Sequence, residues 1–372
     1  MKKRVIVSVV NDLLTDQRVH RTCLVLNELG FDILLVGRQL KKSLPLPTRN
    51  YSTHRMKILF EKGPFFYGIF NLRLFLFLLV KKSDLLVSND LDTLLPNYLI
   101  HKIKGIPLVY DSHEYFTEVP ELVNRKRVQM VWKKLEKSIF PKLNEVITVN
   151  DSIASLYEKE YGIRPEVVRN ISNKPENIQK RSRKELGLPE NKFILILQGS
   201  GINVQRGAEE MLEAMQYIED AVLLIIGGGD VIEKLHQLTE KFDVKDKIIF
   251  KPKLEYSLLL EYTACADLGL TLDKDTNINY RFSLPNKLFD YIHSGVPVLA
   301  SPLPEIKKII EQYQIGDFIP DHNPKNIANK VIEILVNQQL MEKWKKNCTF
   351  ASTELTWQKE SEKLQSIFAK YA

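Results

Sequence analysis

The chain has few cysteines and no long uninterrupted apolar run in its 372 residues. Its three cysteines, Cys23, Cys265 and Cys348, lie far apart, with neither the spacing of a metal site nor an even number for disulfides. This usage is typical of a reducing compartment. The apolar run Val5–Val10 is too short for a signal peptide and predicts a first buried strand. We therefore expect a cytoplasmic protein.

Positive charge gathers in the first half of the chain. Residues 1–170 carry 27 Lys and Arg against 18 Asp and Glu, a net charge of +9, and the remainder carries 26 against 28, a net charge of −2. No zinc spacing, helix-turn-helix or mixed aromatic and basic ribbon accompanies this charge, so we expect no nucleic-acid partner. An anionic membrane surface is the better candidate.

Short apolar runs alternate with amphipathic stretches in both halves, which predicts parallel sheets wrapped by helices. The fold class is therefore α/β, with two doubly wound, Rossmann-like domains. We expect domains at 1–170 and 191–350, joined by a polar linker at 171–190 and followed by a C-terminal helix at 351–372. The predicted strands are 5–10, 32–36, 85–87, 108–110, 145–149, 193–197, 221–226, 247–250, 268–270 and 298–300.

One segment, residues 63–82, departs from this alternation because it is apolar and aromatic and ends in Lys81-Lys82. Asn71 and Arg73 interrupt it, so it is too short and too polar for a membrane span of about 20 apolar residues. Two interpretations stay open: a helix packed on the N-terminal sheet, or a helix lying in a membrane interface.

The most informative segment is Tyr280–Ala300, YRFSLPNKLFDYIHSGVPVLA, which indicates a loop, a helix, a glycine turn and a strand. Ser283 is expected to cap the helix, with Pro285 near its first turn. Free N–H groups at such a helix start favour anions. With Asp290 one turn further in, a nucleotide fits: phosphate on the amides and ribose on the carboxylate. The alternative is an ordinary loop-helix-strand unit with Asp290 solvated.

This segment resembles the donor-site signature of the GT-B glycosyltransferases, in particular the large retaining group called family 4. The resemblance extends over nearly the whole chain. It implies two domains with a cleft between them and a C-terminal helix that crosses back onto the N-terminal domain. It also implies that 191–350 binds a nucleotide-sugar and 1–170 binds an acceptor. The donor-binding residues it indicates here are Ser283, Leu284, Pro285, Asn286 and Asp290.

In the first half, three loops that follow predicted strands carry candidate residues. His113, in DSHEYFTEVPEL, is a candidate hydrogen-bond donor or base, or else a helix-capping histidine. The resemblance implies that it contacts the donor sugar. Asp16 and Arg18 resemble the family's first loop on the acceptor side, although Asp16 equally suits a helix cap. Asp90 lies in an Asp-x-Asp, which we interpret as an acceptor-side or structural residue and not as a metal ligand.

In the second half, Gly199 and Gly201 form a glycine turn without the further glycine of a dinucleotide fingerprint, because Val204 stands in its place. The resemblance implies that Arg206 contacts the diphosphate. It also implies that the turn at Gly228 lies under the nucleotide and that the turn at Lys253 offers backbone groups to the edge of the base. For each of these residues the alternative is an ordinary strand-to-helix turn or a solvated cation.

The chain departs from the family pattern at two positions. Phe282 stands where the signature has its first acid, and Ser200 stands where relatives carry a second basic residue; Lys287 or Arg281 is a candidate for that missing charge. Asn286 or Asn279 is a candidate for holding the donor sugar in place of the missing acid.

The function expected from the resemblance is metal-independent transfer of a sugar from a nucleotide-sugar, UDP or GDP as base, to a glycan or lipid-linked acceptor with retention. No cofactor is expected, and the setting is bacterial surface-glycan or lipid-linked sugar assembly at the inner face of the membrane. The alternatives are a non-catalytic GT-B-like partner of a membrane or another transferase and, more distantly, a nucleotide-sugar epimerase.

Overall fold

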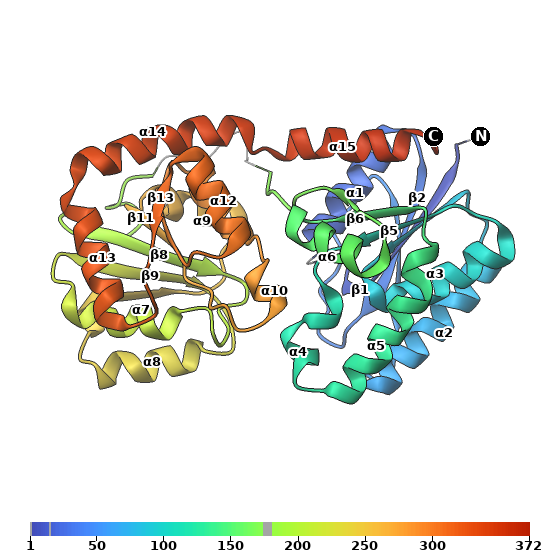
Figure 1. The fold of residues 1–372 in the computed structure, drawn as a ribbon, viewed down its shortest axis with the longest axis horizontal. Helices are drawn as coiled ribbons and strands as arrows, with labels where there is room; N and C mark the ends of the chain where they lie inside the picture. The colour runs from blue at the N-terminus through green and yellow to red at the C-terminus, as the bar shows by residue number, and fades with distance from the viewer. Residues whose placement is uncertain (1, 15, 174–180) are drawn as a thin grey trace. The chain divides into compact units, whose positions relative to one another are not determined.

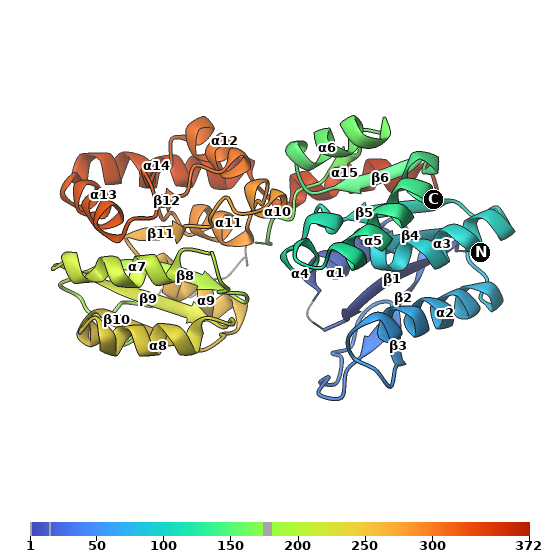
Figure 2. The same ribbon diagram turned by 60° about the horizontal axis from the view of Figure 1, so that its bottom comes forward.

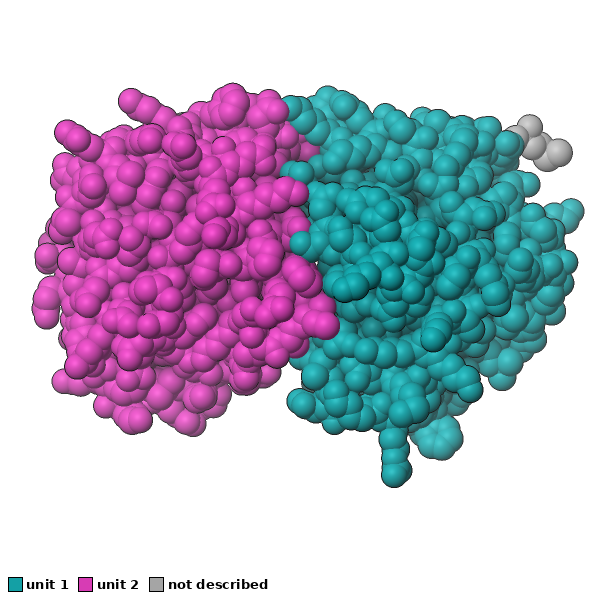
Figure 3. Space-filling view, viewed as in Figure 1, with its two compact units in different colours: residues 1–170, 358–372 teal, residues 171–357 magenta. Residues whose placement is uncertain are grey.

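The computed structural model describes residues 2–14, 16–173 and 181–372. The chain divides into two compact units, residues 1–170 with 358–372 and residues 171–357 (Figure 3). Of the predicted linker, residues 174–180 lie outside the described residues. Its flanks belong to the second unit, where Ile171, Leu186 and Leu188 are buried in the core.

Unit 1 is built on one parallel sheet with the strand order β3-β2-β1-β4-β5-β6-β7 (Figure 1). The order reverses between β1 and β4, and at such a switch point the carboxyl ends of the strands form the usual ligand site of open α/β sheets. The strands are β1 (Arg4–Asp12), β2 (Asp32–Gln39), β3 (Ser52–Lys57), β4 (Leu85–Asn89), β5 (Leu108–Ser112), β6 (Glu145–Thr148) and β7 (Glu166–Val167).

The helices of unit 1 pack on both sides of this sheet, since the crossovers on either side of β1 run in opposite directions. The last helix returns from the end of the chain, and its Leu364 and Phe368 are buried while Gln365 bonds to Glu28 of the first helix. The helices are α1 (Gln17–Glu28), α2 (Pro64–Val80), α3 (Leu91–Lys104), α4 (Pro120–Val123), α5 (Lys126–Ile139), α6 (Asp151–Tyr161) and α15 (Trp357–Ala369).

Unit 2 repeats the same plan, with the strand order β10-β9-β8-β11-β12-β13 (Figure 2). Alternate residues of β8 enter opposite faces: Leu195 and Leu197 join one core cluster, and Ile194 and Ile196 join the other. Both faces are buried, which explains the continuous apolar runs of these strands. The strands are β8 (Phe193–Gly199), β9 (Ala221–Gly227), β10 (Ile248–Lys251), β11 (Leu268–Thr271), β12 (Val298–Ala300) and β13 (Gly316–Phe318).

The helices of unit 2 also fall into two layers. One hydrophobic core cluster contains residues of α7, α8 and α13, and the other contains residues of α9, α11 and α12. Helix α14 contributes residues to both clusters. Their bounds are α7 (Ala208–Ala214), α8 (Ile232–Lys241), α9 (Tyr256–Ala264), α10 (Ile278–Arg281), α11 (Asn286–His293), α12 (Pro304–Tyr313), α13 (Pro324–Val336) and α14 (Gln338–Glu354).

The predicted fold class, two doubly wound parallel α/β domains, is confirmed. All ten predicted strands are present, whereas β3, β7 and β13 were not predicted. Residues 63–82 form helix α2. No helix among the described residues combines the length and the apolar character needed to cross a membrane.

Candidate functional site

Two neighbouring strand ends of unit 1 bring His113 into contact with three polar side chains. Its Nδ1 lies 3.3 Å from Oδ2 of Asp90, and its Nε2 lies 3.4 Å from Oδ2 of Asp111 and 3.2 Å from Oδ1 of Asn89. Asn89 ends β4, Asp111 lies in neighbouring β5, and His113 follows that strand. The switch point of the sheet therefore holds an imidazole between two carboxylates.

Arg18, on the first turn of α1, fixes one of these carboxylates. Its Nη2 donates to Oδ1 of Asp111 at 2.7 Å, and its Nε donates to Oδ2 at 3.1 Å. A third bond runs from Nη1 to the carbonyl oxygen of Val168. Because the arginine side chain is only 4% exposed and bonded in three directions, it holds Asp111 against His113 and is not presented to an acceptor.

The two charged pairs set the protonation of this cluster. Burial works against the charged forms, but Arg18 and His113 outweigh it and hold the pKa of Asp111 well below its usual range. Burial likewise opposes the imidazolium, yet Asp90 and Asp111 raise the pKa of His113 to about 9. His113 is therefore an imidazolium at neutral pH. A raised pKa favours the role of hydrogen-bond donor over that of base.

Asp90 and Asp16 both have partners within the protein. Asp90 has a positive φ of 59°, and its Oδ1 accepts from the backbone N–H of His113 at 2.9 Å. Asp16 caps α1 by accepting from the N–H of Val19 and also accepts from the side chain of Asn11. No group of three His, Cys, Asp or Glu side chains suited to a metal ion occurs in the part of the chain that the structure describes.

In unit 2, two glycine turns interlock at the carboxyl ends of β8 and β9. A Cβ on Gly227, whose φ is 133°, would lie 1.8 Å from the carbonyl oxygen of Gly199. The backbone of Gly228 closes the junction. Its N–H donates to the carbonyl oxygen of Gly199, and its carbonyl oxygen accepts from the N–H of Ile202. Gly228 itself has open space where a side chain would begin. The backbone of this turn is thus open to close approach by a ligand.

Arg206 and Lys287 share one buried carboxylate, that of Asp273. Nη1 of Arg206 donates to Oδ1 at 2.8 Å, and Nζ of Lys287 lies 3.8 Å from Oδ2. Asp273 is fully buried, whereas the side chains of Arg206 and Lys287 are 28% and 10% exposed. Burial and the charge of Arg206 lower the pKa of Lys287, against the opposing effect of Asp273. Because two cations pair with one anion, this cluster has a net positive charge at the carboxyl end of β11.

The sequence analysis did not single out Asp273. Its signal was present, because Thr-Leu-Asp follows an apolar strand at the edge where the other candidate residues lie. Of the two candidates for the missing basic charge, Lys287 joins Arg206, while Arg281 pairs with Asp275 on the surface. Tyr280 lies under the guanidinium of Arg206, with 4.9 Å between Cζ and the ring centroid.

The start of α11 differs from the prediction. The cap residue is Pro285 and not Ser283, whose hydroxyl donates back to the carbonyl oxygen of Tyr280 at 2.9 Å. The prediction that Ser283 caps this helix is wrong because the helix begins at Asn286, after an extended Pro285 that lies two residues beyond Ser283, and the hydroxyl of Ser283 is used in the preceding turn. No side chain caps the helix, and Leu284 precedes its cap residue.

Asp290 is buried at 6% exposure, and its two oxygens accept from two side chains. Oδ1 accepts from the hydroxyl of Tyr256 at 2.8 Å, and Oδ2 accepts from the amide of Gln198 at 3.1 Å. Thr263 in turn donates to Gln198. Both carboxylate oxygens of Asp290 therefore accept a hydrogen bond within the protein.

The remaining candidates lie nearer the surface. Gly201 is half-buried, and Lys253 is exposed in the turn before α9. Of the two departures from the family pattern, Phe282 is half-buried behind α10, and Ser200 is exposed after β8.

Comparisons with known families cover most of the chain. Residues 16–173 match the family described as Glycosyltransferase Family 4, and residues 178–349 match the family described as Glycosyl transferases group 1.

Two proteins of similar sequence are themselves named as glycosyltransferases. The chitobiosyldiphosphodolichol beta-mannosyltransferase of Candida albicans is 23% identical over 239 residues, which cover 59% of this chain and 51% of that protein. The chain thus spans about half the length of that relative. An uncharacterized glycosyltransferase of Methanocaldococcus jannaschii is 20% identical over 288 residues, covering 72% of this chain and 69% of that protein.

Solved structures show the same fold over the full length. Sucrose-phosphate synthase from Thermosynechococcus elongatus superposes with a TM-score of 0.80 at 15% identity, covering 99% of each chain. HepE of Anabaena, solved in complex with UDP, superposes with a TM-score of 0.72 at 14% identity, covering 99% of this chain and 100% of that one. At such identities the likeness concerns the fold.

Proposed function

We propose that this chain, a protein of GT-B fold similar to glycosyltransferase family 4, transfers a sugar from a nucleotide-sugar to an acceptor hydroxyl. The observation that carries the proposal is the pair Arg206 and Lys287 on the buried carboxylate of Asp273, at the carboxyl edge of a doubly wound sheet. When the bond between sugar and diphosphate breaks, the diphosphate gains negative charge, and fixed cations stabilise that charge.

The surrounding residues suit the rest of a nucleoside diphosphate. The open turn at Gly228 lets a ligand approach the backbone, and the uncapped start of α11 offers N–H groups to a phosphate. Asp290 is assigned to the ribose, beside the hydroxyl of Tyr256. Because two side-chain cations are available at the diphosphate, the transfer is proposed to need no metal ion and no cofactor.

His113 is assigned to the donor sugar. As an imidazolium whose Nδ1 faces Asp90 and whose Nε2 faces Asp111, it has fixed charge and orientation. One of these two N–H groups is proposed to be shared with a sugar oxygen in the complex, and His113 is not proposed to serve as a base. Asp90 and Asp16 are proposed to face the acceptor. Arg18 is proposed to act through Asp111, whose carboxylate it holds beside His113. Retention at the anomeric carbon is proposed on the resemblance to family 4 alone.

The nature of donor and acceptor is proposed from similar proteins. HepE of Anabaena was solved with UDP and with UDP-glucose, which supports a UDP-sugar as the first donor to test, with GDP-sugars second. The Candida albicans relative is named for a dolichol diphosphate acceptor, which supports a lipid-linked glycan. The three free cysteines fit the cytoplasm. A non-catalytic partner role is not favoured, since both halves match transferase families.

The test is release of nucleoside diphosphate from UDP- and GDP-sugars, with a panel of lipid-linked and free glycans as acceptors. We expect release to depend on one donor family and on an acceptor, and to fall by about 10²–10³ in Arg206→Ala. The surface variant Arg281→Ala is the matched control, because that arginine pairs with exposed Asp275. Full activity in Arg206→Ala would contradict the assignment of Arg206 to the diphosphate.

A further inference from the structure

Helix α2 carries two apolar stripes, and only one of them is buried. Phe66, Phe70, Leu74 and Leu78 repeat every fourth residue and are at most 2% exposed, which fixes one side of the helix in the core of unit 1. The second stripe, here called the α2 stripe, consists of Phe65, Leu72, Leu76, Leu79 and Val80, which are 73%, 58%, 51%, 38% and 77% exposed.

Such a surface is unusual for a helix of a globular protein, whose outer face is normally polar. Arg73 is the one charged residue among the 17 of α2. Phe60, 44% exposed, packs against Phe65 at the beginning of the helix and extends the apolar surface there. Contiguous apolar surface of this kind marks an interaction site.

The neighbouring helix α3 also has exposed apolar side chains. Its Leu99 and Ile103 are 40% and 60% exposed, and Lys104 donates from Nζ to the carbonyl oxygens of Leu78 and Lys81. That contact fastens the C-terminal ends of the two helices together, side by side as in Figures 1 and 2. The exposed apolar side chains therefore spread over two helices.

All exposed charge on these two helices and on the turn residues Lys81 and Lys82 is positive. Arg73, Lys102 and Lys104 are exposed along with those two lysines, and the one acid on either helix, Asp92, is buried. An apolar face edged by lysine and arginine is complementary to an anionic lipid surface.

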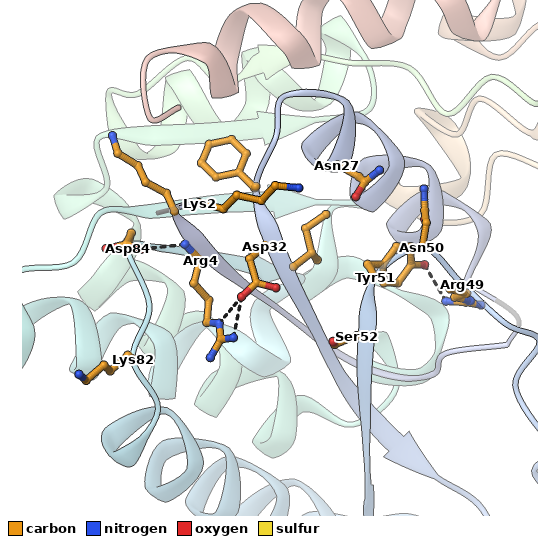
Figure 4. Close-up of a pocket in the computed structure, with 13 residues that line it drawn as sticks. Lys2, Arg4, Asn27, Asp32, Arg49, Asn50, Tyr51, Ser52, Lys82 and Asp84 are labelled. Carbon is orange, nitrogen blue, oxygen red and sulfur yellow. Dashed lines mark hydrogen bonds and ion pairs between the residues drawn. The ribbon is translucent and has the colours of Figure 1, made fainter.

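A basic hollow lies beside the end of α2. It has a volume of about 980 Å³ and includes Lys2, Lys3, Arg4, Arg49 and Lys82 in its lining, with Asp32 and Asp84 as its acids (Figure 4). Asp32 is paired with Arg4, so the remaining cations leave the hollow net positive. It adds positive charge at the edge of the sheet where the strands begin, next to Lys82.

We propose that the α2 stripe with Leu99 and Ile103 docks on an anionic phospholipid bilayer, with α2 lying flat in the interface. A helix of 17 residues is about 25 Å long, shorter than the roughly 30 Å core of a bilayer, so α2 lies on the membrane and does not span it. The lysines at its end and around the hollow meet the phosphate head groups. This surface is separate from the strand ends that hold His113.

The test is cosedimentation of the full chain with vesicles of phosphatidylcholine alone or with one third phosphatidylglycerol. We expect binding to the anionic vesicles that weakens with added salt. Binding should fall at least tenfold in Leu72→Gln/Leu76→Gln and in Lys81→Glu/Lys82→Glu. The control Val336→Gln/Phe350→Gln removes two exposed apolar residues of unit 2, 74% and 64% exposed, and should bind as the unchanged protein does.

Three outcomes would overturn the proposal. The first is equal binding by all variants, and the second is no binding to either vesicle. The third is a lipid-free dimer, seen by sedimentation velocity, that Leu72→Gln/Leu76→Gln dissociates, since a second copy would then cover the face. Circular dichroism of each variant checks the fold. Vesicle binding is read without turnover, so its failure leaves the proposed transferase activity untouched.

Discussion

Arg18 and Asp111, 93 positions apart in the sequence, form a two-pronged ion pair in the core of unit 1, with side chains 4% and 1% exposed. The pair orients His113 through the same carboxylate. Arg18, which the resemblance assigned to the acceptor side, thus supports the carboxylate beside the proposed sugar-binding histidine.

Removing one partner of this pair is expected to be costly. Arg18→Ala leaves Asp111 buried with only His113 to compensate it, and we expect the free energy of unfolding to fall by about 3–5 kcal/mol. Urea unfolding measures the change. Arg164→Ala, which breaks a surface pair with Glu158, is the matched control and should leave the midpoint almost unchanged. Equal effects of the two variants would contradict the buried role.

The charge of His113 makes stability depend on pH. Its folded pKa of about 9 exceeds the unfolded value of about 6.5. The imidazolium therefore contributes stability that is complete below pH 6.5 and is lost as pH rises through 9. The contribution is on the order of 3 kcal/mol.

The measurement is the unfolding free energy of the protein and of His113→Gln between pH 6 and pH 10. We expect the difference between them to shrink as pH rises over that range. A difference that is constant with pH would show that folding does not shift the pKa of His113.

Asp273 is expected to act as a positioning residue. Asp273→Asn removes the anion between Arg206 and Lys287, so the two cations repel and lose their fixed geometry. We expect kcat to fall by about tenfold or more with a smaller change in KM, because the donors are needed most in the transition state. Asp273→Glu should restore part of kcat. A purely structural role would instead lower the melting temperature in both variants while leaving kcat of the folded fraction intact.

The glycine turns provide a second matched pair. Gly227→Ala places a Cβ 1.8 Å from the carbonyl oxygen of Gly199 at a φ of 133°, and should destabilise unit 2 by several kcal/mol. Gly228→Ala meets nothing within 4 Å and should keep stability while weakening nucleotide binding, since its methyl group stands where a ligand approaches. Thermal melts with and without nucleotide separate the two effects. Normal nucleotide affinity in Gly228→Ala would move the ligand away from this turn.

Much of the fold follows from pattern. Continuous apolar runs such as Val5–Val10 predicted the buried central strands, and these are present. The edge strand Ser52–Lys57 was missed because its residues, STHRMK, are mostly polar and exposed. Its pairing with β2 fixes it as a strand, and no local sequence signal does so. Gly316–Phe318 was missed because it is an edge strand of only three residues beside β12.

The site was less predictable than the fold. His113, Arg206 and Lys287 were selected as candidates from motifs and from the family resemblance, but their partners depend on which strand ends meet. Asp273 was missed because an aspartate after a short strand has no distinctive local spacing. The wrong assignment of the α11 cap to Ser283 arose because the course of the loop before Pro285 depends on tertiary packing.

The most direct test of the central claim is a thermal-shift titration with UDP, GDP and ADP on the unchanged protein, Arg206→Ala and Arg281→Ala. We expect one nucleotide to stabilise the protein, by about 2.7 kcal/mol at a hundredfold excess over Kd. That stabilisation should disappear in Arg206→Ala and persist in Arg281→Ala. Absence of a shift with every nucleotide, or an unchanged shift in Arg206→Ala, would contradict a donor site built on Arg206, Lys287 and Asp273.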